Sequence, residues 1–112
     1  MANSITYKVT CTNANTAYNL LTGTTVAPTM AQRVAASKGH GITFQCQTNG
    51  ALGFAGGSDV FSNAGIAFLG PDGAYQPPAG SQPGSSSFQA GDWWVYSDTA
   101  GAIVVGQLIK SV

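Results

Sequence analysis

The sequence predicts an all-β fold: a small antiparallel β-sandwich or jelly roll, formed as a single domain by residues 1–112. Short runs of alternating apolar and polar residues are the first sign, because a strand with one face in a core and one in water has this period of two. Turn-forming residues separate the runs. The composition agrees, since the chain has no Glu and only five Leu, whereas helical bundles and coiled coils are rich in both.

The N-terminal run is the clearest strand. Its apolar residues fall on one face and alternate with polar residues: Ile5, Tyr7, Val9 and Cys11. Residues 17–21 follow a turn-like segment and form a second expected strand. Residues 1–4 are uncharged and too short to fold alone, so they are a candidate arm.

A hairpin is expected in the middle of the chain. Residues 42–46 alternate between apolar and polar side chains. Asn49 and Gly50 follow, and both tolerate the positive φ of a tight turn. Residues 52–55 would then return antiparallel to the first of these strands.

Three further strands are expected toward the C-terminus. Residues 66–69 end at a Gly-Pro-Asp-Gly turn over residues 70–73. Residues 93–96 and 102–109 are expected to form a second hairpin, because turn-like residues separate them. Gly106, inside the last strand, marks either a bulge or a close approach to the backbone.

Two segments do not show a strand pattern. Residues 28–37 fit a short helix, with Thr29 as its cap and Gly39 as its terminator, or an extended edge segment. We favour the extended form, because residues 33–35 have no clear period. Residues 76–87 are rich in Pro, Gly and Ser and are expected to form an exposed loop.

The two cysteines, Cys11 and Cys46, are expected to be small buried apolar groups. A disulfide is the alternative if their strands are neighbours. We expect no metal site, because the chain has no Cys-x-x-Cys motif and a single His.

The charge balance excludes several classes of partner. The chain has four Lys and Arg residues and four Asp residues, so its net charge is zero. A nucleic-acid-binding surface, by contrast, needs an excess of basic residues. No apolar stretch approaches the roughly 20 residues of a membrane span. No secretory signal is visible at the N-terminus. We therefore expect no nucleic acid and no membrane as partners, and synthesis in a cytoplasm.

Groups for catalysis are scarce. The four Asp residues lie in or beside turn-like sequence, where they cap backbone groups. Asp92 and Asp98 lie at the two ends of one expected strand, roughly 20 Å apart, which is too far for a carboxylate pair. His40 lies between two glycines in an expected loop that would not hold an imidazole firmly. We expect a protein that is not an enzyme, with no catalytic residues and no cofactor.

The aromatic strand at residues 93–96 has two interpretations. Trp93 and Val95 face one way, and Trp94 and Tyr96 face the other, so one pair fills the core. The opposite pair is either an exposed patch suited to a partner or is covered by a neighbouring segment. The candidate interface residues are Trp94 and Tyr96 on this strand and Ile5 and Tyr7 on the first strand.

The apolar residues also point to self-association. Sixteen of them are Ala, which buries little area, so a chain of this length is expected to gain stability by forming homo-oligomers.

Five segments along most of the chain carry a resemblance to a known class of protein. They are ITYKVT (5–10), GITFQC (41–46), GFAGGSDV (53–60), GIAFL (65–69) and DWWVYSDTAG (92–101). With these segments the chain resembles the small β-sandwich virion proteins of tailed bacteriophages, which include capsid-decorating and fibre-like parts. The shared patterns are patterns of fold and contain no catalytic residue.

The resemblance implies a structural virion protein located on the capsid surface. The leading hypothesis is a capsid decoration, or cement, protein that binds the major capsid protein as a homotrimer or another homo-oligomer. The alternative is a host-receptor or glycan-binding module of a fibre or spike, with Trp94 and Tyr96 forming a shallow aromatic site beside the loop at 77–87.

Overall fold

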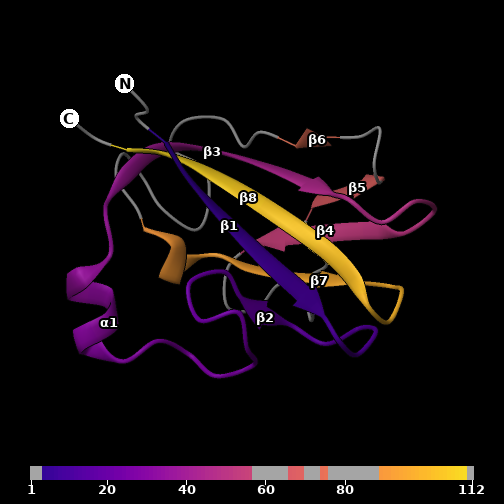
Figure 1. Cartoon of the computed structure of the whole chain (residues 1–112), viewed down its shortest axis with the longest axis horizontal. Helices are drawn as coiled ribbons and strands as arrows, with labels where there is room; N and C mark the ends of the chain where they lie inside the picture. The colour runs from indigo at the N-terminus through magenta and orange to yellow at the C-terminus, as the bar shows by residue number, and fades with distance from the viewer. Residues whose placement is uncertain (1–3, 57–65, 70–73, 76–88, 111–112) are drawn as a thin grey trace.

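The computed structural model describes residues 4–56, 66–69, 74–75 and 89–110 (Figure 1). The described chain is mostly β, with one short α-helix, α1 (Met30–Ala35), and one 3-10 turn, η1 (Ala90–Asp92). The strands are β1 (Ser4–Cys11), β2 (Tyr18–Asn19), β3 (Gly39–Cys46), β4 (Leu52–Gly56), β5 (Ile66–Leu69), β6 (Ala74–Tyr75), β7 (Trp94–Ser97) and β8 (Ala102–Lys110).

The strands form two four-stranded sheets. One has the order β1-β8-β3-β6 and the other has the order β2-β7-β4-β5. Every described pairing is antiparallel. The all-β prediction is confirmed, and the finer expectation of a sandwich or jelly roll stays a prediction.

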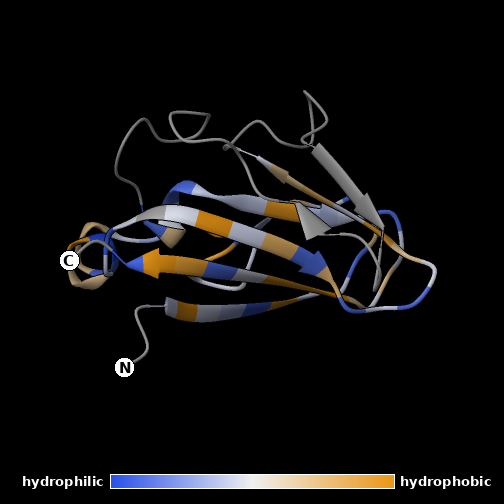
Figure 2. Ribbon diagram, turned by 90° about the horizontal axis from the view of Figure 1, so that it is seen from above, coloured by the Kyte–Doolittle hydropathy of each residue, from blue (hydrophilic) through white to orange (hydrophobic). Residues whose placement is uncertain are grey.

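Inward-facing side chains from both sheets form one core. In β1 the predicted alternation is confirmed, since Val9 and Cys11 are buried while Thr6, Lys8 and Thr10 are exposed. Figure 2 shows hydrophobic and hydrophilic residues alternating along the strands. Phe44 of β3 and Trp93, which precedes β7, meet in this core with ring centroids 5.1 Å apart. This contact joins the first sheet to the segment that leads into the second.

Strand β8 lies at the centre of the first sheet, between β1 and β3 (Figure 1). Its pairing with β1 runs without a register shift from Ala102 to Ile109, so the bulge expected as one possibility at Gly106 is wrong. The other possibility, that another part of the chain closely approaches the backbone at Gly106, is confirmed. A Cβ at Gly106 would lie 3.0 Å from Leu20 Cδ2 and 3.1 Å from Phe44 Cε1.

Both predicted hairpins are wrong. β3 belongs to the first sheet and β4 to the second, and β8 and β7 are divided in the same way. The turns themselves are present, since Gly50 and Gly101 have φ of +80° and +82°. A tight turn reverses the chain without specifying the strand that it pairs with. Here each connection passes from one sheet to the other.

The segment at 28–37 forms α1, so the preference for an extended segment is wrong. Thr29 is the N-cap, as the helical alternative proposed, and forms a capping box with Gln32. Gly39 does not end the helix; α1 ends at Ala35, and Gly39 begins β3. No residue of α1 is buried, so residues 33–35 lack the core-facing apolar period that would have favoured a helix.

The cysteines are free and buried, so the alternative of a disulfide is wrong. β8 lies between their strands. Two strand spacings are about 10 Å, which is beyond the reach of a disulfide. Burial raises the pKa of the Cys11 thiol from 9.0 to about 11, with a smaller contribution from Cys46. The Cys11 thiol is therefore protonated at neutral pH.

Some expected segments fall partly or wholly outside the described residues. Ser4 is the first residue of β1 and pairs with Ile109, so it does not belong to an arm, and residues 1–3 lie outside. The turn at 70–73 and the loop at 76–87 also lie outside. Among the helices that the structure describes, none has the length and apolar character of a membrane span.

Gly106→Ala is expected to lower the free energy of unfolding by about 1–3 kcal/mol, because the added methyl group overpacks the core. Denaturant unfolding followed by tryptophan fluorescence measures this loss. Gly41→Ala is the matched control, since a Cβ there meets Ile109 Cγ1 at 3.6 Å, an ordinary contact. Equal stability of the two variants would contradict the close packing at Gly106.

Candidate functional site

The four candidate interface residues lie on different sheets. Ile5 and Tyr7 are on β1, at the edge of the first sheet, and Trp94 and Tyr96 are on β7 of the second. The structure therefore does not bring the four residues together.

The predicted exposed aromatic patch on β7 is wrong at Tyr96. Its side chain is 7% exposed, and its ring stacks on Phe54 of β4 with centroids 4.5 Å apart and planes 8° apart. The two residues are directly opposite in the β4–β7 pairing. Burial raises the pKa of the Tyr96 hydroxyl. The alternative, in which a neighbouring strand covers this face, is confirmed at Tyr96, and Trp94 is half-buried.

Ile5 and Tyr7 lie beside a shallow pocket of about 380 Å³ between β1 and the end of α1. Leu21 joins them in its apolar lining, and Gln32 and Ser37 contribute polar groups. Both β1 side chains are half-buried, although they share a face with the buried Val9 and Cys11. Partial burial raises the pKa of the Tyr7 hydroxyl. The core face of β1 is therefore incompletely covered in its N-terminal half.

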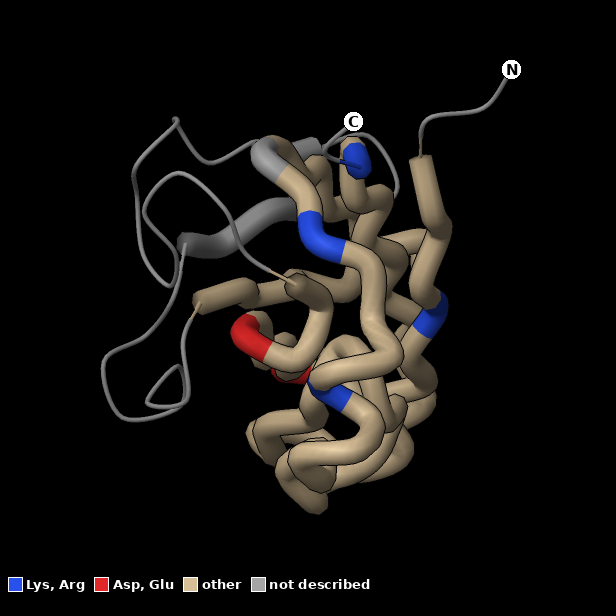
Figure 3. The backbone as a smooth tube through the Cα atoms, turned by 90° about the vertical axis from the view of Figure 1, so that its left-hand side faces the viewer, with Lys and Arg blue, Asp and Glu red and all other residues tan. Residues whose placement is uncertain are grey.

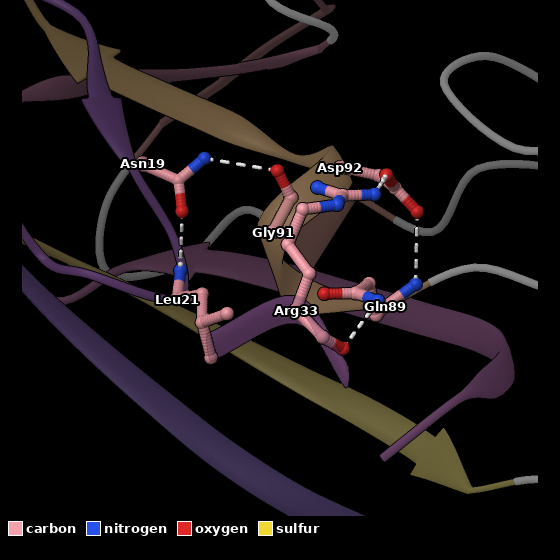
Figure 4. Close-up of polar contacts among 6 residues, drawn as sticks. All are labelled: Asn19, Leu21, Arg33, Gln89, Gly91 and Asp92. Atoms are coloured by element: carbon pink, nitrogen blue, oxygen red, sulfur yellow. Dashed lines mark hydrogen bonds and ion pairs between the residues drawn. The ribbon is translucent and has the colours of Figure 1, made fainter. Parts of the chain in front are cut away.

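A polar cluster of Asn19, Arg33, Gln89, Gly91 and Asp92 joins α1 to the body of the molecule (Figure 4). Arg33 of α1 forms an ion pair with Asp92 of η1. The Gln89 side chain donates to the Arg33 carbonyl at 2.9 Å, and the Asp92 carboxylate accepts from the Gln89 N–H at 3.0 Å. The two contacts of Arg33 fix α1 against η1, and the third closes the start of η1.

The buried Asn19 side chain makes the second half of the polar cluster. Its amide donates to the Gly91 carbonyl at 3.0 Å, and its oxygen accepts from the Leu21 N–H at 2.9 Å. A Cβ at Gly91 would lie 2.9 Å from Arg33 Nη1 and 3.0 Å from Gln89 Oε1, so a side chain there would displace these two polar groups. The polar cluster thus connects β2, α1 and η1 through hydrogen bonds to backbone groups. This pattern indicates a structural role, which is to hold these elements together.

Helix α1 presents apolar side chains to solvent. Met30 and Val34 are 75% and 78% exposed, and Val26, just before the helix, is 67% exposed. Met30 and Val34 are four positions apart and so share one face of α1. They line a second shallow pocket, of about 340 Å³, with Arg33, Lys38 and Gln89. We call Val26, Met30 and Val34 the α1 surface.

Sequence reasoning missed the polar cluster and the α1 surface. Two local signals were present: the Thr29-x-x-Gln32 capping box and the Met30–Val34 spacing. The partners of Arg33 lie 56 and 59 positions away, so no local pattern points to them.

The remaining candidates for catalysis or metal binding are the Asp residues and His40, and the described ones do not form a common site. Asp92 caps η1 as expected, whereas Asp98 accepts from the Leu52 N–H of β4 at 3.0 Å. His40 lies in β3, so its expected position in a loop is wrong. Asp59 and Asp72 lie outside the described residues. Within the described ranges, no three His, Cys, Asp or Glu side chains gather as metal ligands would.

Comparisons of the chain with protein-family models, with curated proteins and with solved structures gave no match.

Asp92→Ala is expected to lower the free energy of unfolding by about 1–2 kcal/mol, because it removes the acceptor of the Gln89 N–H and the partner of Arg33. Asp92→Asn keeps an acceptor oxygen and removes only the charge, so we expect a loss below about 1 kcal/mol. Denaturant unfolding measures both values. An Asp92→Ala variant as stable as the wild type would show that the polar cluster does not fasten α1.

Proposed function

We propose that this protein is a structural protein of a tailed-phage virion. More specifically, we propose a capsid decoration protein that binds the outside of the head and stabilises the lattice of the major capsid protein. It would act as a homotrimer or another homo-oligomer. The resemblance carried by five segments along the chain leads to this proposal, and the α1 surface is the observation in the structure that supports it best.

The α1 surface has the character of a contact surface. Two of its three side chains are more than 70% exposed on one face of a short helix, and a side chain that is free to bury apolar area on docking contributes to affinity. The polar cluster fixes this helix to η1, which leads into β7 of the second sheet. A contact surface held rigidly in this way loses little conformational entropy when it binds.

The low charge supports a permanent contact. The chain has eight charged residues of the Lys, Arg and Asp types, and Figure 3 shows the described ones scattered over the backbone. Surface with few charges is covered by a partner at a small desolvation cost. Strong charge complementarity, by contrast, mainly accelerates encounter. A protein that stays on a shell after assembly needs a low desolvation cost more than it needs a fast encounter.

The alternative of a receptor-binding or glycan-binding module stays a prediction. It relied on Trp94 and Tyr96 forming one exposed aromatic site, and Tyr96 is covered by Phe54. The loop at 77–87 that would border this site lies outside the described residues. The capsid proposal therefore has the better support.

Purified protein is expected to co-sediment with expanded heads of its phage that were assembled without it. Val34→Asp should weaken this binding by about tenfold or more, since it places a charge in a desolvated contact. Gln32→Glu is the matched control: it adds the same charge at an exposed position on the opposite side of α1 and keeps the oxygen that closes the capping box. No residue of α1 is buried, so both variants should fold.

Failure of the wild-type protein to bind such heads would contradict the decoration proposal. Equal binding by the Val34→Asp and Gln32→Glu variants would show that the α1 surface is not the contact.

A further inference from the structure

Strand β1 forms an open edge of the first sheet. It pairs with β8 on one side, and no strand of the described residues pairs with its other side. Figure 2 shows β1 as the outermost strand of its sheet. The exposed edge spans eight residues, Ser4–Cys11, which is longer than the edge strands that proteins usually leave unpaired.

The hydrogen bonds of β8 show which backbone groups of β1 face outward. Ile103 points toward β3, because its carbonyl accepts from the Gln47 N–H and its N–H donates to Thr48 Oγ1. Backbone groups alternate along a strand, so Val104 and every second residue after it point toward β1. In β1 the residues opposite these are Val9, Tyr7 and Ile5.

The intervening residues of β1 therefore direct their N–H and C=O groups to the open edge: Ser4, Thr6, Lys8 and Thr10. Their side chains lie on the outer face of the sheet, where Thr6, Lys8 and Thr10 are exposed. One outward group has a partner already, since the Thr10 carbonyl accepts from the Thr12 N–H at 3.0 Å.

The usual protection against edge pairing is weak in β1. Proteins blunt such edges with proline, bulges or several charges. β1 has no proline, its register with β8 has no shift, and Lys8 is its one charged residue. An open edge of this kind accepts another strand in antiparallel alignment.

A second copy of β1 can pair with this edge in several registers, and one of these registers is more favourable than the registers shifted to either side of it. With Tyr7 opposite Tyr7 of the second copy, Thr6 pairs with Lys8 and Ser4 pairs with Thr10, so all four outward residues of each strand lie in hydrogen-bonded pairs. A shift that places Lys8 opposite Lys8 brings like charges together. That shift also leaves Ser4 of each strand without a partner in the other β1. The opposite shift, with Thr6 opposite Thr6, leaves Thr10 of each strand without one.

The same register covers the incompletely buried face of β1. Ile5 and Tyr7 are half-buried beside the pocket of about 380 Å³. In this register Val9 of the second copy lies opposite Ile5, and the two Tyr7 side chains meet on the same face. Apolar area that is partly open in one copy would then be buried between two.

We infer that the chain forms a two-fold dimer in which the β1 strands of two copies pair antiparallel about Tyr7, joining their first sheets into one continuous sheet. The inference concerns self-association alone and stands whether or not the chain binds a capsid.

Cysteine cross-linking tests the register. Tyr7→Cys is expected to give a disulfide-linked dimer on mild oxidation, because residues in a non-hydrogen-bonded pair have Cα atoms about 4.5 Å apart, within disulfide range. Ile5→Cys is the matched control on the same face of β1: the two Cys residues would lie about 13 Å apart and should not cross-link. Cys11 and Cys46 are buried and should not react in either variant.

Charge variants on the exposed face test the same pairing without touching the core. Thr6→Lys places a second cation opposite Lys8 of the other copy and should weaken dimerisation by about tenfold, as measured by sedimentation equilibrium. Adding Lys8→Glu to Thr6→Lys should restore the dimer. Thr12→Lys is the control, since Thr12 is exposed and lies beyond β1.

A wild-type protein that sediments as an 11.4 kDa monomer at all concentrations, or as a trimer, overturns the inference. So does a cross-link through Ile5→Cys but not through Tyr7→Cys, because it requires another register. Failure of Lys8→Glu to restore the dimer of Thr6→Lys also overturns it.

Discussion

The double pairing of β8 is the constraint on which the rest of the structure depends. β8 bonds β1 along one side and β3 along the other, and this alignment turns the apolar faces of three strands toward one core. Gly106 at its middle leaves room for Leu20 and Phe44, and Phe44 in turn meets Trp93 beside the second sheet. A slip of one residue in β8 would send every one of its core side chains to the outer face.

The same pairing decides which surfaces are open to partners. Because β8 occupies the centre, β1 becomes the edge, and the half-buried Ile5 and Tyr7 lie beside a pocket rather than within the core. On the other side of that pocket, α1 is fastened by Arg33 and Gln89 and displays Met30 and Val34. The edge proposed for a second copy and the apolar surface proposed for a larger partner therefore lie on different elements, β1 and α1.

The sequence was sufficient for local features and insufficient for pairing. A period of two identified β1 and β3, and the turn residues at Gly50 and Gly101 were correctly placed. A turn residue specifies only that the chain reverses, which is why both hairpin predictions failed. The covering of Tyr96 by Phe54 was open for the same reason, because it follows from the β4–β7 pairing. α1 was weighed and not preferred, because it buries no residue that would give it an apolar period. The Arg33–Asp92 pair was missed because its members are 59 positions apart.

The central claim is that β8 pairs with β1 and β3 and does not form a hairpin with β7. Nuclear Overhauser contacts between backbone protons test it most directly. The structure predicts contacts from Val104 to both Val9 and Cys46, its register partners on either side. A ladder of contacts that pairs residues 94–97 with residues 102–105 as a hairpin would contradict the account.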